Sequence, residues 1–269
     1  MIAELSPLII FYYAIGGVFA GLVGGLLGLG GGIIVVPLLH FLFNLQGFPG
    51  ASLMQVAVTT SLATIIVTSL AATRIHHQKQ AVLWPLVLRL APGIVIGAGL
   101  GALLADAVSS DVLRIAFGVF EILVAIQIAV DFKPAAKFGL PATQGLVLSG
   151  GGIGFLSTLL GIGGGTLTVP YLLFCRVPMH NAVAVSSACG LPIAVAGMTA
   201  MIISGLDNPE LPVHSIGYLY WPGALIIIAM TVFCAPLGAR LAHRLPVLTL
   251  KRCFSVVLLL VGLKMLFPV

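Results

Sequence analysis

Two stretches of the chain share one pattern: LLGLGGGIIVVP at residues 26–37 and LLGIGGGTLTVP at residues 159–170. Each glycine in a helix interior costs about 1 kcal/mol relative to alanine. Three consecutive glycines therefore predict a helix break in each stretch, and a proline (Pro37 or Pro170) follows within two turns of the next expected helix start. We call residues 28–32 the first glycine elbow and residues 161–165 the second.

The composition indicates that both elbows belong to a membrane protein. The chain has 269 residues, of which 60% are hydrophobic and 7% are charged. Soluble domains carry roughly 25% Asp, Glu, Lys and Arg, so these charges are too few to cover a soluble core. The net charge of +5 comes without a run of Lys and Arg, which argues against a nucleic-acid partner. We expect an all-α integral membrane protein whose main partner is the lipid bilayer.

Ten apolar segments are expected to be helical. They are residues 8–28, 31–44, 55–73, 85–105, 112–131, 144–161, 164–176, 182–205, 217–242 and 249–268. A helix that crosses a bilayer needs about 20 apolar residues. The second and seventh segments are short for a full crossing, so we expect half-helices or strongly tilted helices there.

The ten segments form two groups of five, because the sequence is duplicated. VAVTTS at residues 56–61 is echoed by VAVSSA at residues 183–188, and LGA at 100–102 returns at 237–239. With the elbows, these anchors occur in the same order in both halves. We therefore predict a first membrane repeat over residues 1–132, a linker over 133–141 and a second repeat over 142–269.

Charge placement predicts that the two repeats have opposite orientations. Short loops rich in Lys and Arg stay in the cytoplasm, so the basic 74–79 loop should be inside and the acidic 106–111 loop outside. In the second half the acidic residues lie at 207–210 and the basic residues at 240–252. Five segments in each half, an odd number, produce this inversion. The basic 133–137 linker is then cytoplasmic and both termini lie outside.

The elbows are candidates for an anion site near the membrane midplane. A helix N-terminus carries unsatisfied N–H groups and a partial positive charge, and inverted repeats bring two such ends together. The candidate binding residues are Gly30, Gly31, Gly32 and Ile33 in the first half and Gly163, Gly164, Gly165 and Thr166 in the second. The alternative is that these glycines only allow helices to cross closely.

Hydroxyl side chains cluster in the third segment of each half. The candidates are Thr59, Thr60, Ser61, Ser186 and Ser187. Hydroxyl groups can donate to an oxyanion without the desolvation cost of a charge. They can equally bond carbonyls of their own helix or join neighbouring helices, and the sequence leaves both readings open.

Among the ionisable residues within the apolar segments, Arg89 and Glu121 are the functional candidates. Such residues are functional candidates by default because they are costly in lipid. Arg89 is close enough to the cytoplasmic face for its long side chain to reach water. Glu121 is in the middle of its segment, where it can pair with Arg89 or carry a coupling proton.

No cofactor or metal ion is predicted. No strand precedes the glycine elbows, no acidic residue follows about 20 residues later, and the Walker lysine is absent, which excludes a nucleotide site. His76 and His77 adjoin Arg74 and Lys79, a pattern more typical of a solvated helix face than of a metal site.

Together, the elbows, the TTS segment and the closing LGA pattern resemble the sulfite exporter TauE/SafE family, also called TSUP, over nearly the whole chain. The resemblance implies a permease of the cytoplasmic membrane for small sulfur-containing anions such as sulfite or organosulfonates. One departure is that the second hydroxyl segment reads SSA where the first reads TTS, so the two half-sites are not expected to be equivalent.

The resulting hypothesis is a secondary transporter that holds a small anion between the elbows and works by alternating access. An anion channel of the same architecture and a carrier of another oxyanion, such as thiosulfate, remain alternatives. A membrane enzyme is not expected, because no nucleophile or metal set stands out in the sequence. The coupling proton or cation and the oligomeric state cannot be read from the sequence.

Overall fold

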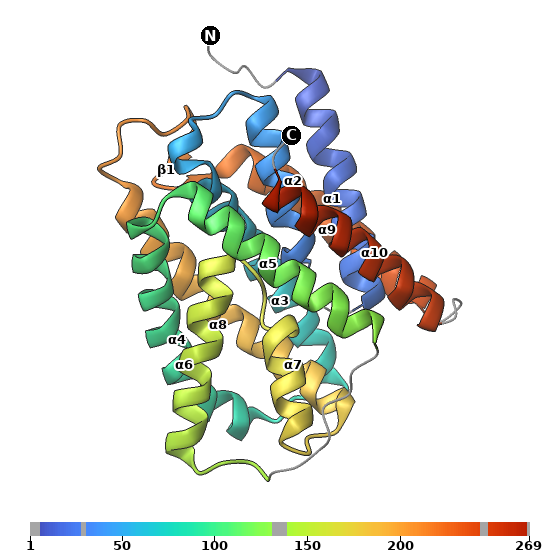
Figure 1. Cartoon of the computed structure of the whole chain (residues 1–269). Helices are drawn as coiled ribbons and strands as arrows, with labels where there is room; N and C mark the ends of the chain where they lie inside the picture. Colours follow the sequence, from blue (N-terminus) through green and yellow to red (C-terminus); the bar gives the residue numbers. More distant parts are fainter. Residues whose placement is uncertain (1–5, 28–30, 131–138, 243–246, 268–269) are drawn as a thin grey trace.

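The computed structural model describes residues 6–27, 31–130, 139–242 and 247–267, and these form an almost entirely helical protein (Figure 1). Seven stretches of the described residues are long and apolar enough to cross a membrane. The helices are α1 (Pro7–Leu27), α2 (Gly32–Leu45), α3 (Leu53–Gln78), α4 (Trp84–Ala107), α5 (Ser110–Ala129), α6 (Thr143–Leu160), α7 (Gly165–Phe174), α8 (Met179–Gly205), α9 (Trp221–Ala242) and α10 (Val247–Leu266). A 3₁₀ turn, η1 (Gly50–Ser52), precedes α3.

Each of the ten predicted segments corresponds to one of these helices, and two boundaries differ by more than three residues. Helix α3 continues to Gln78, five residues beyond the predicted end, because polar residues that stop a membrane segment do not stop a helix. The predicted segment 217–242 begins with a hairpin of β1 (Ser215–Ile216) and β2 (Leu219–Tyr220), and α9 starts only at Trp221. Gly217, with φ of 52°, makes the turn, and Pro222 fits the first turn of a helix.

The hairpin is fixed to the rest of the protein by two hydrogen bonds. The Tyr218 hydroxyl donates to a carboxylate oxygen of Asp106 at 2.7 Å, at the end of α4. The Tyr220 backbone N–H donates to the Thr60 hydroxyl oxygen of α3 at 3.2 Å. These bonds explain why an apolar stretch that could extend a helix is held as a hairpin.

Helices α2 and α7 are too short to cross a bilayer. They have 14 and 10 residues, which at 1.5 Å per residue is about 21 Å and 15 Å, against a hydrocarbon core of about 30 Å. Each begins at a glycine elbow and contains the proline that follows it, Pro37 or Pro170. The structure therefore has the half-helices that the short segments indicated.

The principal helix contacts join the two halves of the sequence. Helix α1 packs on α9, and α6 packs on α4, so the first helix of each half lies against the fourth helix of the other. Helix α3 packs on α8, and α5 on α10. Figure 1 shows α5 and α10 side by side across the front and α4 beside α6 at the left. The pairing is what a two-fold relation between the halves would produce, and their opposite orientation in the membrane stays a prediction.

The polarity of the surface and interior is that of a protein surrounded by lipid. Large apolar side chains such as Leu148 and Phe233 are exposed on the outer surface, with exposed fractions of 80% and 74%. Polar side chains such as Gln55, Thr60 and Ser157 are fully or almost fully buried between helices. Hydrogen-bonding groups are thus kept away from the apolar surroundings.

Small residues allow the helix pairs to approach closely. Three glycines of α4, one turn apart, face α6: Gly93, Gly97 and Gly101. A Cβ atom added to Gly97 would overlap the backbone of Gly151 in α6. Gly17 and Gly21 of α1 lie likewise against the backbone of α9. Such glycine contacts gain van der Waals packing where lipid removes the hydrophobic driving force between helices.

This packing predicts opposite effects for two glycines of the same helix. Gly97→Ala should lower the free energy of unfolding by about 1–3 kcal/mol, because the new methyl group must displace the α6 backbone. Gly99→Ala, whose Cβ would meet nothing within 4 Å, should be neutral or stabilising by up to about 1 kcal/mol. Thermal unfolding of the purified protein in detergent measures the difference. Equal melting temperatures for the two variants would contradict this account of the α4–α6 contact.

Candidate functional site

The second glycine elbow ends α6 and starts α7. Gly161 has φ of 65°, a left-handed conformation that glycine adopts without a steric penalty. Its N–H donates to the Thr158 carbonyl at 3.1 Å, and the Ile162 N–H donates to the Ser157 carbonyl at 2.9 Å. These two bonds form the Schellman motif that closes a helix C-terminus. Helix α7 then begins at Gly165 with its first N–H groups free of intrahelical partners.

The first elbow has a comparable helix start. Gly31 has φ of 73° and precedes α2, and its carbonyl accepts from the N–H groups of Ile34 and Val35. Residues 28–30, and with them the predicted site residue Gly30, lie outside the described residues.

The two elbows touch each other. A Cβ atom added to Gly32 would lie 2.9 Å from the Gly161 carbonyl oxygen and 3.1 Å from the Ile162 Cα. The Ser61 hydroxyl of α3 donates to the same Gly161 carbonyl at 2.8 Å. Residues separated by about half the chain thus meet, as the predicted pairing of the elbows requires.

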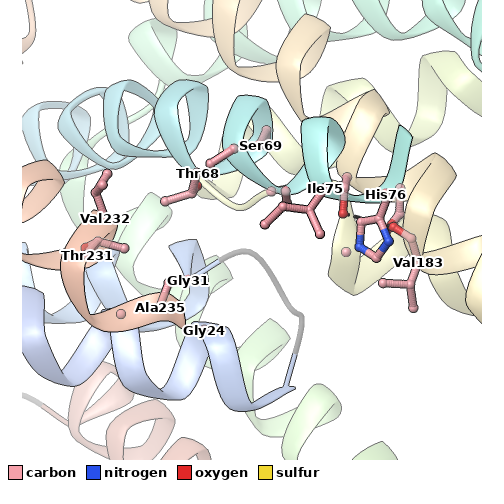
Figure 2. Close-up of a pocket in the computed structure, with 18 of the residues that line it drawn as sticks. Gly24, Gly31, Thr68, Ser69, Ile75, His76, Val183, Thr231, Val232 and Ala235 are labelled. Atoms are coloured by element: carbon pink, nitrogen blue, oxygen red, sulfur yellow. Dashed lines mark hydrogen bonds between the residues drawn. The ribbon is translucent and has the colours of Figure 1, made fainter. Parts of the chain in front are cut away.

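A cavity of about 510 Å³ reaches both elbows (Figure 2). Its walls come from α1, α3, α8 and α9, and it extends along α3 to Lys79, at the exposed C-terminal end of that helix. Six predicted site residues line it: Gly31, Gly163, Gly164, Gly165, Ser186 and Ser187. The predicted residues Gly32, Ile33, Thr59, Thr60, Ser61 and Thr166 are described but are not among the lining residues.

The hydroxyls of the TTS segment are engaged with the backbone. Thr59 donates to the Gln55 carbonyl of its own helix at 2.7 Å, and Ser61 donates to the second elbow. Thr60 accepts the Tyr220 N–H. These three side chains are buried and in this structure hold α3, the elbow and the hairpin together, which is the second of the two readings that the sequence left open.

The corresponding serines of α8 have a different position. Ser186 and Ser187 both donate to the Val183 carbonyl at 2.9 Å and also line the cavity. A hydroxyl bonded to its own helix carbonyl can rotate toward another acceptor, because the C–O bond turns freely. Thr166, beside the elbow, is buried, and its hydroxyl oxygen has no hydrogen-bond partner in the described part of the chain.

Several polar residues of the cavity were missed by the sequence analysis. They are Thr68, Ser69, His76, Lys79 and Thr231. Three of them lie on α3 and Lys79 caps its C-terminus, at the helical spacing that continues the face of the TTS segment. The helical spacing could have identified these residues. The predicted segment ended at residue 73, however, and residues 74–79 were assigned to a cytoplasmic loop.

Ser69 lies beside the second elbow. A Cβ atom added to Gly190 of α8 would overlap the Ser69 hydroxyl and would lie 3.7 Å from the Gly164 nitrogen. The hydroxyl of Ser69 and the amide of Gly164 therefore lie on either side of Gly190, where α8 has no side chain. Both residues line the cavity. An anion in contact with this elbow would have a hydroxyl within reach.

The two ionisable candidates do not lie in the cavity. Arg89 is exposed on α4, and Glu121 is fully buried on α5. Both carboxyl oxygens of Glu121 lack a hydrogen-bond partner among the described residues, so the pair with Arg89 that the sequence allowed is not formed. The remaining reading of Glu121, a coupling carboxyl, stays a prediction.

Aromatic side chains pack together at the ends of α1, α2 and α9 that lie away from the elbows. The rings of Phe43 and Phe48 stack at 4.7 Å between centroids, and Tyr220 contacts them edge-on at 5.5 Å and 5.1 Å. The Tyr13 ring lies 6.4 Å from Phe43 and its hydroxyl accepts from Gln46. Phe43 is 11 residues, about 16 Å, from the start of α2 at the elbow. The cavity thus approaches the elbows from one side, and an aromatic cluster lies beyond the other.

A multi-pass helical protein with broken helices in contact and a cavity that reaches them has the architecture of a secondary transporter. Residues 13–265 match the family described as sulfite exporter TauE/SafE. A probable membrane transporter protein of Haemophilus influenzae is 33% identical over 252 residues, covering 93% of this chain and 95% of that protein. Another, of Methanocaldococcus jannaschii, is 30% identical over 267 residues, covering 97% and 96%. The chain belongs to the TauE/SafE sulfite exporter family and is a membrane transporter, not an enzyme.

The cavity predicts where a bulky side chain blocks transport. Ala72 lines it, whereas Leu70, on the same helix, is 57% exposed and is not among the lining residues. Ala72→Trp should abolish most transport because the indole fills the passage to the elbows, and Leu70→Trp should leave transport close to wild type. Substrate flux in proteoliposomes, at equal amounts of monodisperse protein, compares the two. Similar fluxes in both variants would mean that this cavity is not the substrate path.

Proposed function

We propose that this protein is a secondary carrier for small sulfur-containing anions, such as sulfite or organosulfonates, that works by alternating access. The observation that carries the proposal is the cavity that reaches both glycine elbows from one side. The name of the family supports the choice of sulfur oxyanions as substrates. Thiosulfate is the principal alternative substrate of the same chemistry.

The groups around the elbows suit an anion. Helices α2 and α7 start there, so their first N–H groups and positive dipole ends face the region of the cavity. Hydroxyls of Ser69, Ser186 and Ser187 line the same space, and the described lining residues include no Asp or Glu. A small oxyanion would therefore exchange its hydration shell for amide and hydroxyl donors without meeting a negative side chain.

The arrangement on either side of the elbows supports alternating access over an open channel. One side holds the cavity and the other holds the aromatic cluster of Tyr13, Phe43, Phe48 and Tyr220. Because helices of one half pack on helices of the other, a rocking motion would close the cavity and separate the aromatic rings. A channel of the same architecture would instead need both sides open together.

The same proposal includes the orientation in a bacterial inner membrane. By the positive-inside rule, the end of α3 with Arg74 and Lys79 faces the cytoplasm. The cavity would then be open to the cytoplasm and the aromatic cluster would lie on the outer side, with both termini outside. Coupling to a proton or cation is part of the hypothesis. Glu121 is its candidate residue because it is buried and its carboxyl oxygens have no hydrogen-bond partner within the described part of the chain.

The deciding experiment is counterflow of radiolabelled sulfite in proteoliposomes, with unlabelled organosulfonates and thiosulfate as competitors. A carrier should show saturable exchange and trans-stimulation, and the competitor ranking identifies the preferred anion. Flux that rises linearly with concentration and shows no counterflow would favour the channel. An absence of exchange for all of these anions, from folded protein, would reject the proposed substrates.

A variant at Ser69 tests whether the anion reaches the second elbow. Ser69→Ala removes a hydroxyl donor to a charged ligand, which is worth about 1.5–3 kcal/mol, so the KM for the transported anion should rise at least roughly tenfold. The matched control is Thr64→Val on the same helix, because the Thr64 hydroxyl bonds the Ser61 carbonyl and is not among the groups lining the cavity. Equal KM values for the two variants would place the anion away from Ser69.

A further inference from the structure

The mouth of the cavity carries an unassigned positive charge. Helix α3 extends five residues beyond the apolar segment and ends at Gln78, and Lys79 is its exposed C-terminal cap. Both His76 and Lys79 line the cavity. Figure 2 shows His76 at one end of the cavity, while Thr231 and Val232 lie at the other. Lys79 follows His76 by three residues and is exposed, so this end of the cavity reaches the protein surface, and we call it the mouth.

Lys79 is unusual among the groups that border this space. Of the described lining residues it is the one Lys or Arg, and His76 is the one histidine. The remaining lining is made of glycine, alanine, hydroxyl and aliphatic residues. In such a low-polarity passage one cation sets the sign of the potential over a distance comparable to the Debye length.

The backbone of α3 makes that charge necessary for an anion. The C-terminus of a helix is the negative end of its dipole, equivalent to about half a negative charge, and α3 ends at this mouth. The carbonyls of Ile75, His76 and His77 accept N–H groups of the following turn, so this negative end is partly paired. Without Lys79 the described lining at this end of the cavity would include a negative helix end and no Lys or Arg side chain. A full positive charge at the cap reverses the sign.

His77 and Arg74, the basic neighbours of Lys79 on α3, do not line the cavity. The Trp84 indole N–H donates to Nδ1 of His77 at 3.1 Å, and their rings contact edge to face. Arg74 is exposed on the same end of α3 and is not among the residues lining the cavity. A basic residue near the end of α3 does not necessarily line the cavity, and among Arg74, His77 and Lys79 only Lys79 does.

We infer that Lys79 is the charge-selecting residue of the cavity mouth, which attracts small oxyanions to the elbows and discriminates against cations and neutral solutes. The inference rests on the proposed function, because it concerns the ligand of the same cavity. It deepens that function by assigning the selection of charge to an entrance residue, separate from the amide and hydroxyl donors that hold the anion.

The first test measures the potential of the cavity without relying on transport. Ser187→Cys places a thiol in the lining, and its rate of modification is followed by peptide mass spectrometry with a sulfonate-bearing and a trimethylammonium-bearing methanethiosulfonate. Lys79→Gln should lower the ratio of the anionic to the cationic rate by roughly five- to tenfold. Lys79→Arg should preserve the ratio, and Arg74→Gln, which removes the same charge from the same helix end, should change it less than twofold.

The ratio of the two reagents cancels any change in the reactivity of the thiol itself, because both react with the same thiolate. The difference between Lys79→Gln and its parent should also shrink at high salt, as screening shortens the range of the charge. Equal effects of Lys79→Gln and Arg74→Gln would overturn the inference, since they would show a diffuse surface potential in place of a charge at the mouth.

Transport separates failure of this inference from failure of the proposed function. If the wild-type protein exchanges sulfite, Lys79→Gln should raise the KM by roughly five- to tenfold with a smaller change in the maximal rate, and Arg74→Gln should not. An unchanged KM in Lys79→Gln would overturn the role of Lys79 while leaving the carrier intact. If the wild type exchanges no sulfur anion, the proposed substrates fail, and the labelling ratio still decides whether Lys79 selects charge.

Discussion

The contact between the two glycine elbows is the constraint on which the rest of the structure depends. Gly32, at the start of α2, lies against the Gly161 carbonyl and Ile162, and Ser61 of α3 bonds that same carbonyl. A side chain at either glycine would separate the two broken helices. Because irregular backbone in a membrane is tolerated only where protein or a cavity covers it, the elbows must be buried against each other and surrounded by the long helices.

The long helices provide that cover by pairing across the two halves of the sequence. Helix α1 lies on α9, α4 on α6, α3 on α8 and α5 on α10, and glycines at the contacts bring the backbones together. The same property suits a carrier. Helix pairs held by shape complementarity between small residues can shift as units while each helix stays intact.

Only some of the hydroxyl groups near the elbows border the cavity. Hydroxyls of the TTS segment hold backbone groups, whereas Ser69, Ser186 and Ser187 border the cavity. The TTS and SSA segments thus differ in position, but both halves line the cavity: the first through Thr68, Ser69, His76 and Lys79, the second through Ser186, Ser187 and Thr231. A single small ligand there would meet different donors on its two sides.

The sequence by itself determined the membrane class, the ten helical segments, the two helix breaks and the family. These depend on local properties: apolar length, glycine runs and repeated motifs are read in one dimension, and lipid and backbone geometry leave few alternatives. Of the predicted site residues, Gly31, the glycines 163–165 and the two α8 serines line the cavity, and their role in binding stays a prediction. The sequence could not rank Thr60 against Ser69, because any buried hydroxyl can bond its own helix, another helix or a ligand.

Only the tertiary structure decided that ranking. In the fold, Ser69 lies beside Gly164 because Gly190 has no side chain between them. Thr60 instead bonds the hairpin at Tyr220. It also extended α3 so that Lys79, which the sequence placed in an ordinary basic loop, borders the cavity. The physical reason is that hydrogen-bond partners and cavity walls are chosen by contacts between residues far apart in the chain, which no local pattern records.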